Sequence, residues 1–283
     1  MAGVSMRDLK QRIKVMENTK QITKAMEMVA SSKLRRAQSR VLASRPYFEI
    51  LYDTLNAIAD NTDDFTSAYL EKREVKRSCY VVIAGDRGLA GGYNHNVLKL
   101  AMSMMQDKDV CVVPIGKKSA EFFRRREIPI VTEAYEEAGD MNVGDCFSVA
   151  KMLAKSFLTG EFDEICVVYT NFVSVLSQSP ASVKLLPLDR DEAKNRGSTD
   201  CLTLYEPDGP SAFDAIIPEY MGGLIYGALC ESVAAEQGAR RTAMDSATKN
   251  ADEMIGDLSL QYNRARQDAI TQEITEIVAG AEQ

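Results

Sequence analysis

The sequence predicts an α/β fold: two long terminal helices that pair as an antiparallel coiled coil, and a central α/β domain with a mostly parallel sheet. Breakers are rare at both ends, with no glycine between Gly3 and Gly85 and no proline after Pro218. The middle alternates short apolar runs with helical patterns, which is typical of βαβ units. The expected N-terminal helix, central domain and C-terminal helix occupy residues 1–60, 75–208 and 212–283.

The N-terminal segment carries apolar residues at steps of three and four. They are Leu9, Ile13, Met16, Met26, Ala30, Leu34, Ala37 and Val41. This spacing predicts an amphipathic helix or one strand of a coiled coil. Thr19 and Thr23 are expected to interrupt the apolar seam. Arg45-Pro46 is expected to kink or end the helix, because the residue before proline is disfavoured in the α region.

The central segment contains the turn signals. Strands are expected at 78–84, 110–115, 128–132 and 164–171, followed by 182–188, with a further edge strand at 201–207. Helices are expected at 93–106, 117–126 and 145–158. This order favours right-handed crossovers between parallel strands.

The C-terminal segment has an alanine at every fourth position from 235 to 251, a stripe that winds around the helix and allows close approach of a partner. The seam is expected to continue through Met254, Leu258, Tyr262, Ala265 and Ala269. The chain must return from the central domain, so the two terminal helices are expected to be antiparallel. Their unequal lengths leave the C-terminal end projecting, and a long helix pair exposes apolar surface unless something surrounds it.

The stretch GDRGLAGGYNHN (85–96) raises the possibility of a phosphate-binding loop between a strand and a helix. Its glycines give GxxGxxGG, which is neither the dinucleotide fingerprint nor the P-loop. Asp86 stands where a phosphate would need amides and positive charge. The sequence therefore favours a tight strand-to-helix turn in which glycine relieves backbone strain.

Composition excludes several classes of protein. The six cysteines are at least 20 residues apart and the single histidine is His95, so no zinc spacing or disulfide framework is present. Most cysteines lie in apolar runs and are expected to be core residues. No nucleophile motif occurs. We predict no catalytic residue, no cofactor site and no metal site.

Charge and hydropathy indicate where the chain acts and what kind of partner it meets. No apolar stretch reaches the roughly 20 residues of a membrane span, and the N-terminus lacks the apolar region of a signal peptide, so a cytosolic chain is expected. The net charge is −7, yet residues 1–45 hold eleven Lys/Arg and three Asp/Glu, a net of +8. This asymmetry indicates an acidic partner for the basic end.

Several long motifs resemble one family over nearly the whole chain. They are NTKQITKAMEMVASSKLRRAQ (18–38), AGDRGLAGGYNHNV (84–97), LLPL (185–188), LYEPD (204–208), AAEQGARRTAMDSATKNA (234–251) and YNRARQDAITQEITEIVAGA (262–281). In this order they are similar to the gamma subunit of bacterial F-type ATP synthases. Only residues 101–165 match loosely.

The resemblance implies a non-catalytic rotor subunit of the central stalk, which couples ion-driven c-ring rotation to ATP synthesis or hydrolysis at alpha–beta sites. It implies a coiled coil inside a hexamer of three alpha and three beta subunits, and a Rossmann-like domain resting on the epsilon subunit and the c-ring. No cofactor and no nucleic acid are implied. The complex would hold the chain peripherally at the cytoplasmic face of the bacterial plasma (inner) membrane.

The same resemblance assigns candidate contact residues. Those facing a beta subunit are Lys24, Met26, Arg264, Arg266 and Gln267. Those of an apolar bearing at the tip are Ile270, Ile274, Ile277 and Val278. Tyr205 would lie near epsilon and the c-ring. For each residue the alternative is ordinary coiled-coil packing or a solvated face.

Two other functions are considered. One is a Rossmann-like nucleotide-binding enzyme with helical dimerisation arms, and the other is a basic coiled-coil scaffold that binds nucleic acid. Neither accounts for the series of motifs. The sequence does not distinguish protons from sodium ions as the driving ion.

Overall fold

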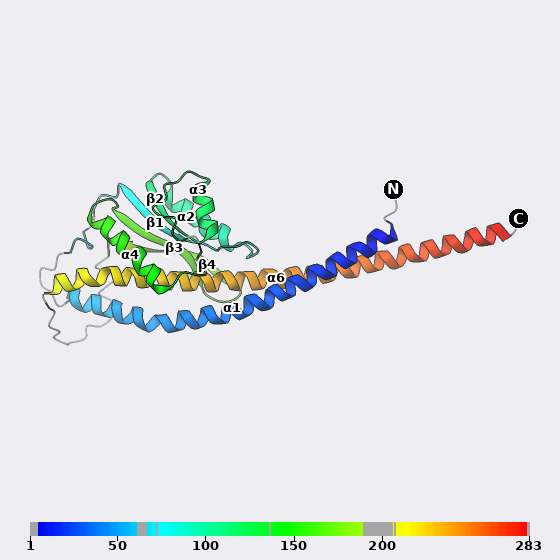
Figure 1. Ribbon diagram of the computed structural model, residues 1–283, viewed down its shortest axis with the longest axis horizontal. Helices are drawn as coiled ribbons and strands as arrows, with labels where there is room; N and C mark the ends of the chain where they lie inside the picture. Colours follow the sequence, from blue (N-terminus) through cyan, green and yellow to red (C-terminus); the bar gives the residue numbers. More distant parts are fainter. Residues whose placement is uncertain are drawn as a thin grey trace. The chain divides into compact units, whose positions relative to one another are not determined.

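The computed structural model describes residues 5–60, 67–71, 73–135, 137–188, 206 and 208–281 (Figure 1). The chain divides into two compact units, Met1–Ser31 with Arg240–Gln283, and Ser32–Ala239. Helices α1 (Met6–Asp60) and α6 (Gly209–Ala281) contribute to both units. All the other described elements belong to the second unit.

Helix α1 does not end at Pro46, and the expectation of a helix end there is wrong. A proline inside a helix costs about 3 kcal/mol, since it removes one hydrogen bond and crowds the preceding turn. The continuing helix offsets this cost by burying Leu55 and Ile58 in the core of the second unit. Helix α6 starts at Gly209, where the Asp208 carboxylate accepts the N–H of Ser211 at 2.7 Å and caps the first turn.

The sheet has the order β2-β1-β3-β4. Its strands are β1 (Arg77–Ile83), β2 (Asp109–Ile115), β3 (Glu164–Phe172) and β4 (Gln178–Leu186). The first three are parallel and β4 is antiparallel to β3. The mostly parallel sheet that the sequence predicts is therefore confirmed.

The strand expected at 128–132 is wrong, because only the single bridge Val112↔Ile130 forms there. Val112 donates its N–H to Pro129 O and accepts from Val131 N, both at 2.9 Å. Proline has no N–H with which to extend the ladder. The edge strand expected at 201–207 lies outside the described residues apart from Glu206.

Helices cover both faces of the sheet, as Figure 1 shows. Alternate strand residues such as Tyr80 and Val82 face helices α2 (Tyr93–Met105) and α3 (Lys117–Arg124). The intervening residues, such as Val81, pack against α4 (Val143–Leu158), the first part of α6 and the end of α1. The five described cysteines are buried and free, as expected of core residues. Burial raises the pKa of Cys146 and of Cys166 to about 12, so both thiols stay protonated.

The first unit is a helix pair with a heptad seam. In α1 the covered positions follow steps of four and three: Leu9, Ile13, Met16, Lys20, Thr23, Glu27 and Ala30. In α6 they are Met244, Thr248, Ala251, Ile255, Leu258 and Tyr262. This 4-3 alternation is the pattern of a left-handed coiled coil.

One expectation about this seam is wrong, because Met254 is 53% exposed and lies off it. Of the two threonines expected to interrupt the apolar seam, Thr23 lies in it and is only 9% exposed, whereas Thr19 is exposed and lies off it. A residue at every fourth position drifts around the helix by about 40° a step, so the alanine stripe cannot stay on one straight seam. From Met244 onward, the heptad positions and not the alanine stripe form the seam with α1.

Candidate partner interface

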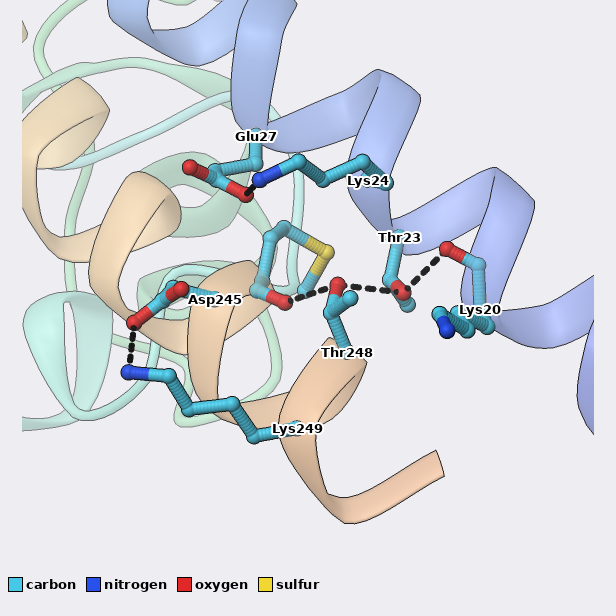
Figure 2. Close-up of polar contacts among 8 residues, drawn as sticks. Lys20, Thr23, Lys24, Glu27, Asp245, Thr248 and Lys249 are labelled. Atoms are coloured by element: carbon cyan, nitrogen blue, oxygen red, sulfur yellow. Dashed lines mark hydrogen bonds and ion pairs between the residues drawn. The ribbon is translucent and has the colours of Figure 1, made fainter. Parts of the chain in front are cut away.

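Two threonines form a polar contact inside the seam of the first unit (Figure 2). Thr23 Oγ1 and Thr248 Oγ1 are 2.8 Å apart, Thr23 Oγ1 is 3.1 Å from Lys20 O, and Thr248 Oγ1 is 2.8 Å from Met244 O. Two hydroxyl protons serve these three contacts. Either Thr248 donates to Thr23 and Thr23 to Lys20 O, or Thr23 donates to Thr248 and Thr248 to Met244 O.

Charges flank the threonines on both helices (Figure 2). Lys24 pairs with Glu27 at 2.9 Å on α1, and Lys249 pairs with Asp245 at 2.8 Å on α6. The Lys249 ammonium, followed by Lys24, holds the pKa of Asp245 below its usual value. The predicted contact Lys24 is therefore already engaged within the chain, although its side chain stays exposed. Met26, the other predicted contact on α1, is half-buried.

In the register of the pair, no described residue of α1 lies opposite the end of α6. Thr23 lies opposite Thr248, and Lys20 bonds Asp252 at 2.6 Å, so the start of α1 at Met6 falls opposite about residue 265. The remaining part of α6, to Ala281, would extend about 24 Å. The sequence-based expectation of a projecting end agrees with this register.

The projecting end is exposed all round. Every described side chain from 270 to 279 is exposed, including the predicted bearing residues Ile270, Ile274, Ile277 and Val278. Arg264, Arg266 and Gln267 are exposed as well. Isoleucines at such positions cost free energy in water, so this end presents apolar surface for a partner.

The structure adds surface residues that the sequence analysis missed. Val15, Ile22 and Val29 are exposed on α1 at steps of seven, which places them in one row away from the seam. The sequence signal that could have revealed these three residues is their spacing of seven positions, a second series beside that of the seam. An open groove on the same helix pair is lined by Asp8, Gln11, Arg12, Val15, Met16, Met254, Asp257 and Leu258.

The glycine loop holds an internal carboxylate. Asp86 accepts N–H groups from Ala138 at 2.9 Å, Gly139 at 3.1 Å and, more weakly, Lys117 at 3.4 Å. These amides lie at the carboxyl end of the parallel strands, where folds of this class bind phosphate. The loop is a tight turn, with Leu89 at φ 63° and Gly91 at φ 55°. The side chain of Asp86 thus takes the donors that a phosphate would need.

Three further features considered from the sequence are Tyr205, metal binding and membrane-spanning segments. Tyr205 lies outside the described residues. Within the described part of the chain, no group of three His, Cys, Asp or Glu side chains could hold a metal ion. In that same part, no helix is long and apolar enough to cross a membrane.

Comparison with known proteins identifies the family. Residues 5–283 match the family described as ATP synthase. The ATP synthase gamma chain of Alkaliphilus metalliredigens is 45% identical, covering 99% of each chain. The sodium ion specific ATP synthase gamma chain of Acetobacterium woodii is 42% identical, covering 98% of each. The chain belongs to the ATP synthase gamma chain family.

Solved structures agree with this fold. A chain from the Euglena gracilis mitochondrial ATP synthase (OSCP/F1/c-ring) superposes with a TM-score of 0.66 at 18% identity, covering 98% of this chain and 93% of that one. A chain from the central stalk and c-ring of the Tetrahymena thermophila enzyme gives 0.57 at 22% identity, covering 80% and 99%. These structures show the shared fold. The family shown by the bacterial relatives makes the chain a central-stalk rotor subunit that is non-catalytic. This family assignment takes the place of the two alternative functions considered from the sequence, a nucleotide-binding enzyme and a nucleic-acid-binding scaffold.

Proposed function

We propose that this gamma chain is the asymmetric shaft that transmits rotation of an ion-driven c-ring to catalytic sites between alpha and beta subunits. The observation that carries the proposal is the end of α6, where every described side chain from 270 to 279 is exposed although several are apolar. Such an end needs an enclosing partner. A collar of three alpha and three beta subunits around one gamma chain supplies it.

The asymmetry of the helix pair supports the mechanism. One face carries the exposed row Val15, Ile22 and Val29, whereas the region drawn in Figure 2 carries charged side chains of both signs. A single shaft with unlike faces meets each of three equal beta subunits differently. Contacts that differ between conformational states shift their populations, so turning the shaft drives the sites through their states in order.

Individual residues take the following proposed roles. Arg266 and Gln267, with Arg264 nearby, hydrogen-bond an acidic loop of a beta subunit, since arginine forms strong charge-assisted bonds with carboxylates. Met26 and the exposed Lys24 face the collar. Ile270, Ile274, Ile277 and Val278 run in an apolar bearing. Tyr205 contacts epsilon or the c-ring.

The proposed setting is peripheral. The chain is held through its complex at the cytoplasmic face of the bacterial plasma membrane, with the α/β domain toward epsilon and the c-ring. The proposed rotor role is the same for protons and for sodium ions, since the ions would bind in other subunits.

Co-expression with the cognate alpha and beta subunits, followed by native mass spectrometry, tests the proposal. We expect a complex with three alpha, three beta and one gamma chain that hydrolyses ATP. The proposal fails if alpha and beta assemble into an active complex without this chain while the chain purifies alone.

A further inference from the structure

Three elements of the second unit meet at one buried hydroxyl. The side chain of Ser232 on α6 is fully buried. Its Oγ accepts the backbone N–H of Thr170 on β3 at 3.3 Å and shares a hydrogen bond with the phenolic oxygen of Tyr93, the first residue of α2, at 2.9 Å. We call Tyr93, Thr170 and Ser232 the Ser232 cluster. It ties the α/β domain to the long C-terminal helix.

Thr170 pairs with Pro180 of β4 on one side of β3, but it lies beyond the residues that β3 pairs with β1 on the other side. Pairing between β1 and β3 ends at Val82↔Val168, two residues before Thr170. Strand β1 therefore offers no carbonyl to the Thr170 amide, and a buried N–H without an acceptor is costly. The Ser232 hydroxyl takes the place of the strand. Helix α6 is thus hydrogen-bonded to the sheet and does not merely rest on it.

The surroundings explain why a directional contact matters here. The neighbouring residues of α6 are small and pack against Ala90, Tyr93 and Phe172; they are Ala234, Ala235, Gly238 and Ala239. Apolar packing of this kind opposes separation but is non-directional. Earlier along α6, large side chains such as Met221, Ile225 and Leu229 enter the core and also resist turning, so the small residues reduce steric resistance only around 234–239.

Besides this core packing and the buried Glu236 beside Gly85, two directional contacts of α6 oppose turning. The hydrogen bonds of Ser232 require a defined orientation of the helix, because bond strength falls steeply with angle. Ten residues earlier, the ring of Phe147 from α4 fills the space that a side chain at Gly222 would occupy. In Figure 1, α4 crosses the first part of α6. Both contacts fix the rotational position of α6 on the domain.

We infer that the Ser232 cluster is a rotational pin, in which Tyr93 and Ser232 are positioning residues that keep α6 and the α/β domain turning as one body under torque. This inference rests on the proposed rotor function. The last member of the packed small residues, Ala239, is also the last residue of the second unit. The pin thus lies where α6 leaves the domain.

Two measurements on Ser232→Ala and Tyr93→Phe test the inference, with Ser246→Ala as the matched control because Ser246 is an exposed serine of α6. The first is amide hydrogen exchange of the full chain. We expect the Thr170 amide to exchange about tenfold faster in Ser232→Ala and unchanged in the control. The second uses the complete complex in vesicles with a dye that reports membrane potential. With an ionophore, ATP hydrolysis should equal that of the wild type; without it, both variants should reach a smaller potential per ATP hydrolysed.

The inference is overturned if both variants assemble, exchange Thr170 at the wild-type rate and reach the wild-type potential. It is also overturned if only exchange changes. Tyr93→Phe keeps its ring and the Ser232–Thr170 bond, so it answers the question should Ser232→Ala fail to assemble. A wild-type complex that hydrolyses ATP but develops no potential would instead contradict the proposed rotor function.

Discussion

At the scale of single residues, the threonine pair in the seam illustrates how polar groups are tolerated inside a coiled coil. Each hydroxyl has a carbonyl on its own helix as a second partner. We therefore predict that Thr23→Val or Thr248→Val alone costs at most about 1 kcal/mol and that the double variant costs no more than either single one. Thermal unfolding, followed by circular dichroism, measures the free energy of unfolding of the wild type, the two single variants and the double variant. A double variant that costs the sum of the singles would contradict this account.

A second residue-scale prediction concerns pH. Asp163 accepts the N–H groups of Arg77 and Lys76, both at 3.0 Å, and these bonds hold its pKa below the usual value, with Arg77 as the larger cause. A lowered pKa gives stabilisation that is complete above the unfolded value of about 3.9 and is lost as pH falls through the folded value. Asp163→Asn should therefore destabilise the chain at pH 7, with a difference that shrinks below about pH 4.

Urea unfolding from pH 7 to pH 3 measures that difference. Asp53→Asn, at an exposed position of α1, is the control and should leave the free energy of unfolding nearly unchanged. A destabilisation by Asp163→Asn that stays constant down to pH 3 would show that the carboxylate charge is not involved.

At the scale of elements, the end of α6 differs from the rest of the helix because every described side chain from 270 to 279 is exposed. A single helix of about 15 residues is marginal in water. We predict that backbone amides of residues 266–281 exchange rapidly in the isolated chain and slowly in the assembled complex. The triple variant of Ile270, Ile274 and Ile277 to Gln should unfold like the wild type when isolated, yet lose the slow exchange in the complex. Equal protection in both states would contradict the need for a partner.

Elements also show what sequence reasoning can reach. Glycine and proline punctuation located both long helices and the parallel strands, since these signals act within a few residues. Of the kink or end predicted at Pro46, the end is wrong, because distant packing continues the helix. The strand predicted at 128–132 is wrong because Pro129 has no N–H with which to extend the ladder. Met254 was misplaced because the partner helix, not the alanine spacing alone, selects the seam.

The candidate contacts followed a similar division. Positions such as Arg266 came from motifs that resemble a family, and the structure shows them exposed. The bonds of Asp86 to Ala138 and of Tyr93 to Ser232 join residues 52 and 139 positions apart. No short-range pattern in a single sequence reports such pairs, so their roles emerge only from the folded chain.

At the scale of the whole molecule, the exposed pair Arg266 and Gln267 should matter to the complex and not to folding. We predict that Arg266→Ala with Gln267→Ala impairs ATPase and pumping in the assembled enzyme, while thermal unfolding of the chain alone is unchanged within about 0.5 kcal/mol. Asn263→Ala, which is also exposed, is the control. Undiminished ATPase and pumping in the assembled double variant would contradict the proposed contact.

The Asp86 carboxylate accepts the backbone amides of Lys117, Ala138 and Gly139. This matters for a rotor subunit that is surrounded by ATP and phosphate. A Rossmann-like domain with those amides free would collect ATP and phosphate from the surrounding solution. Its stiffness would then rise and fall with the energy state of the cell. Because the Asp86 carboxylate already accepts these N–H groups, we expect the mechanics of the stalk not to depend on how much nucleotide is present.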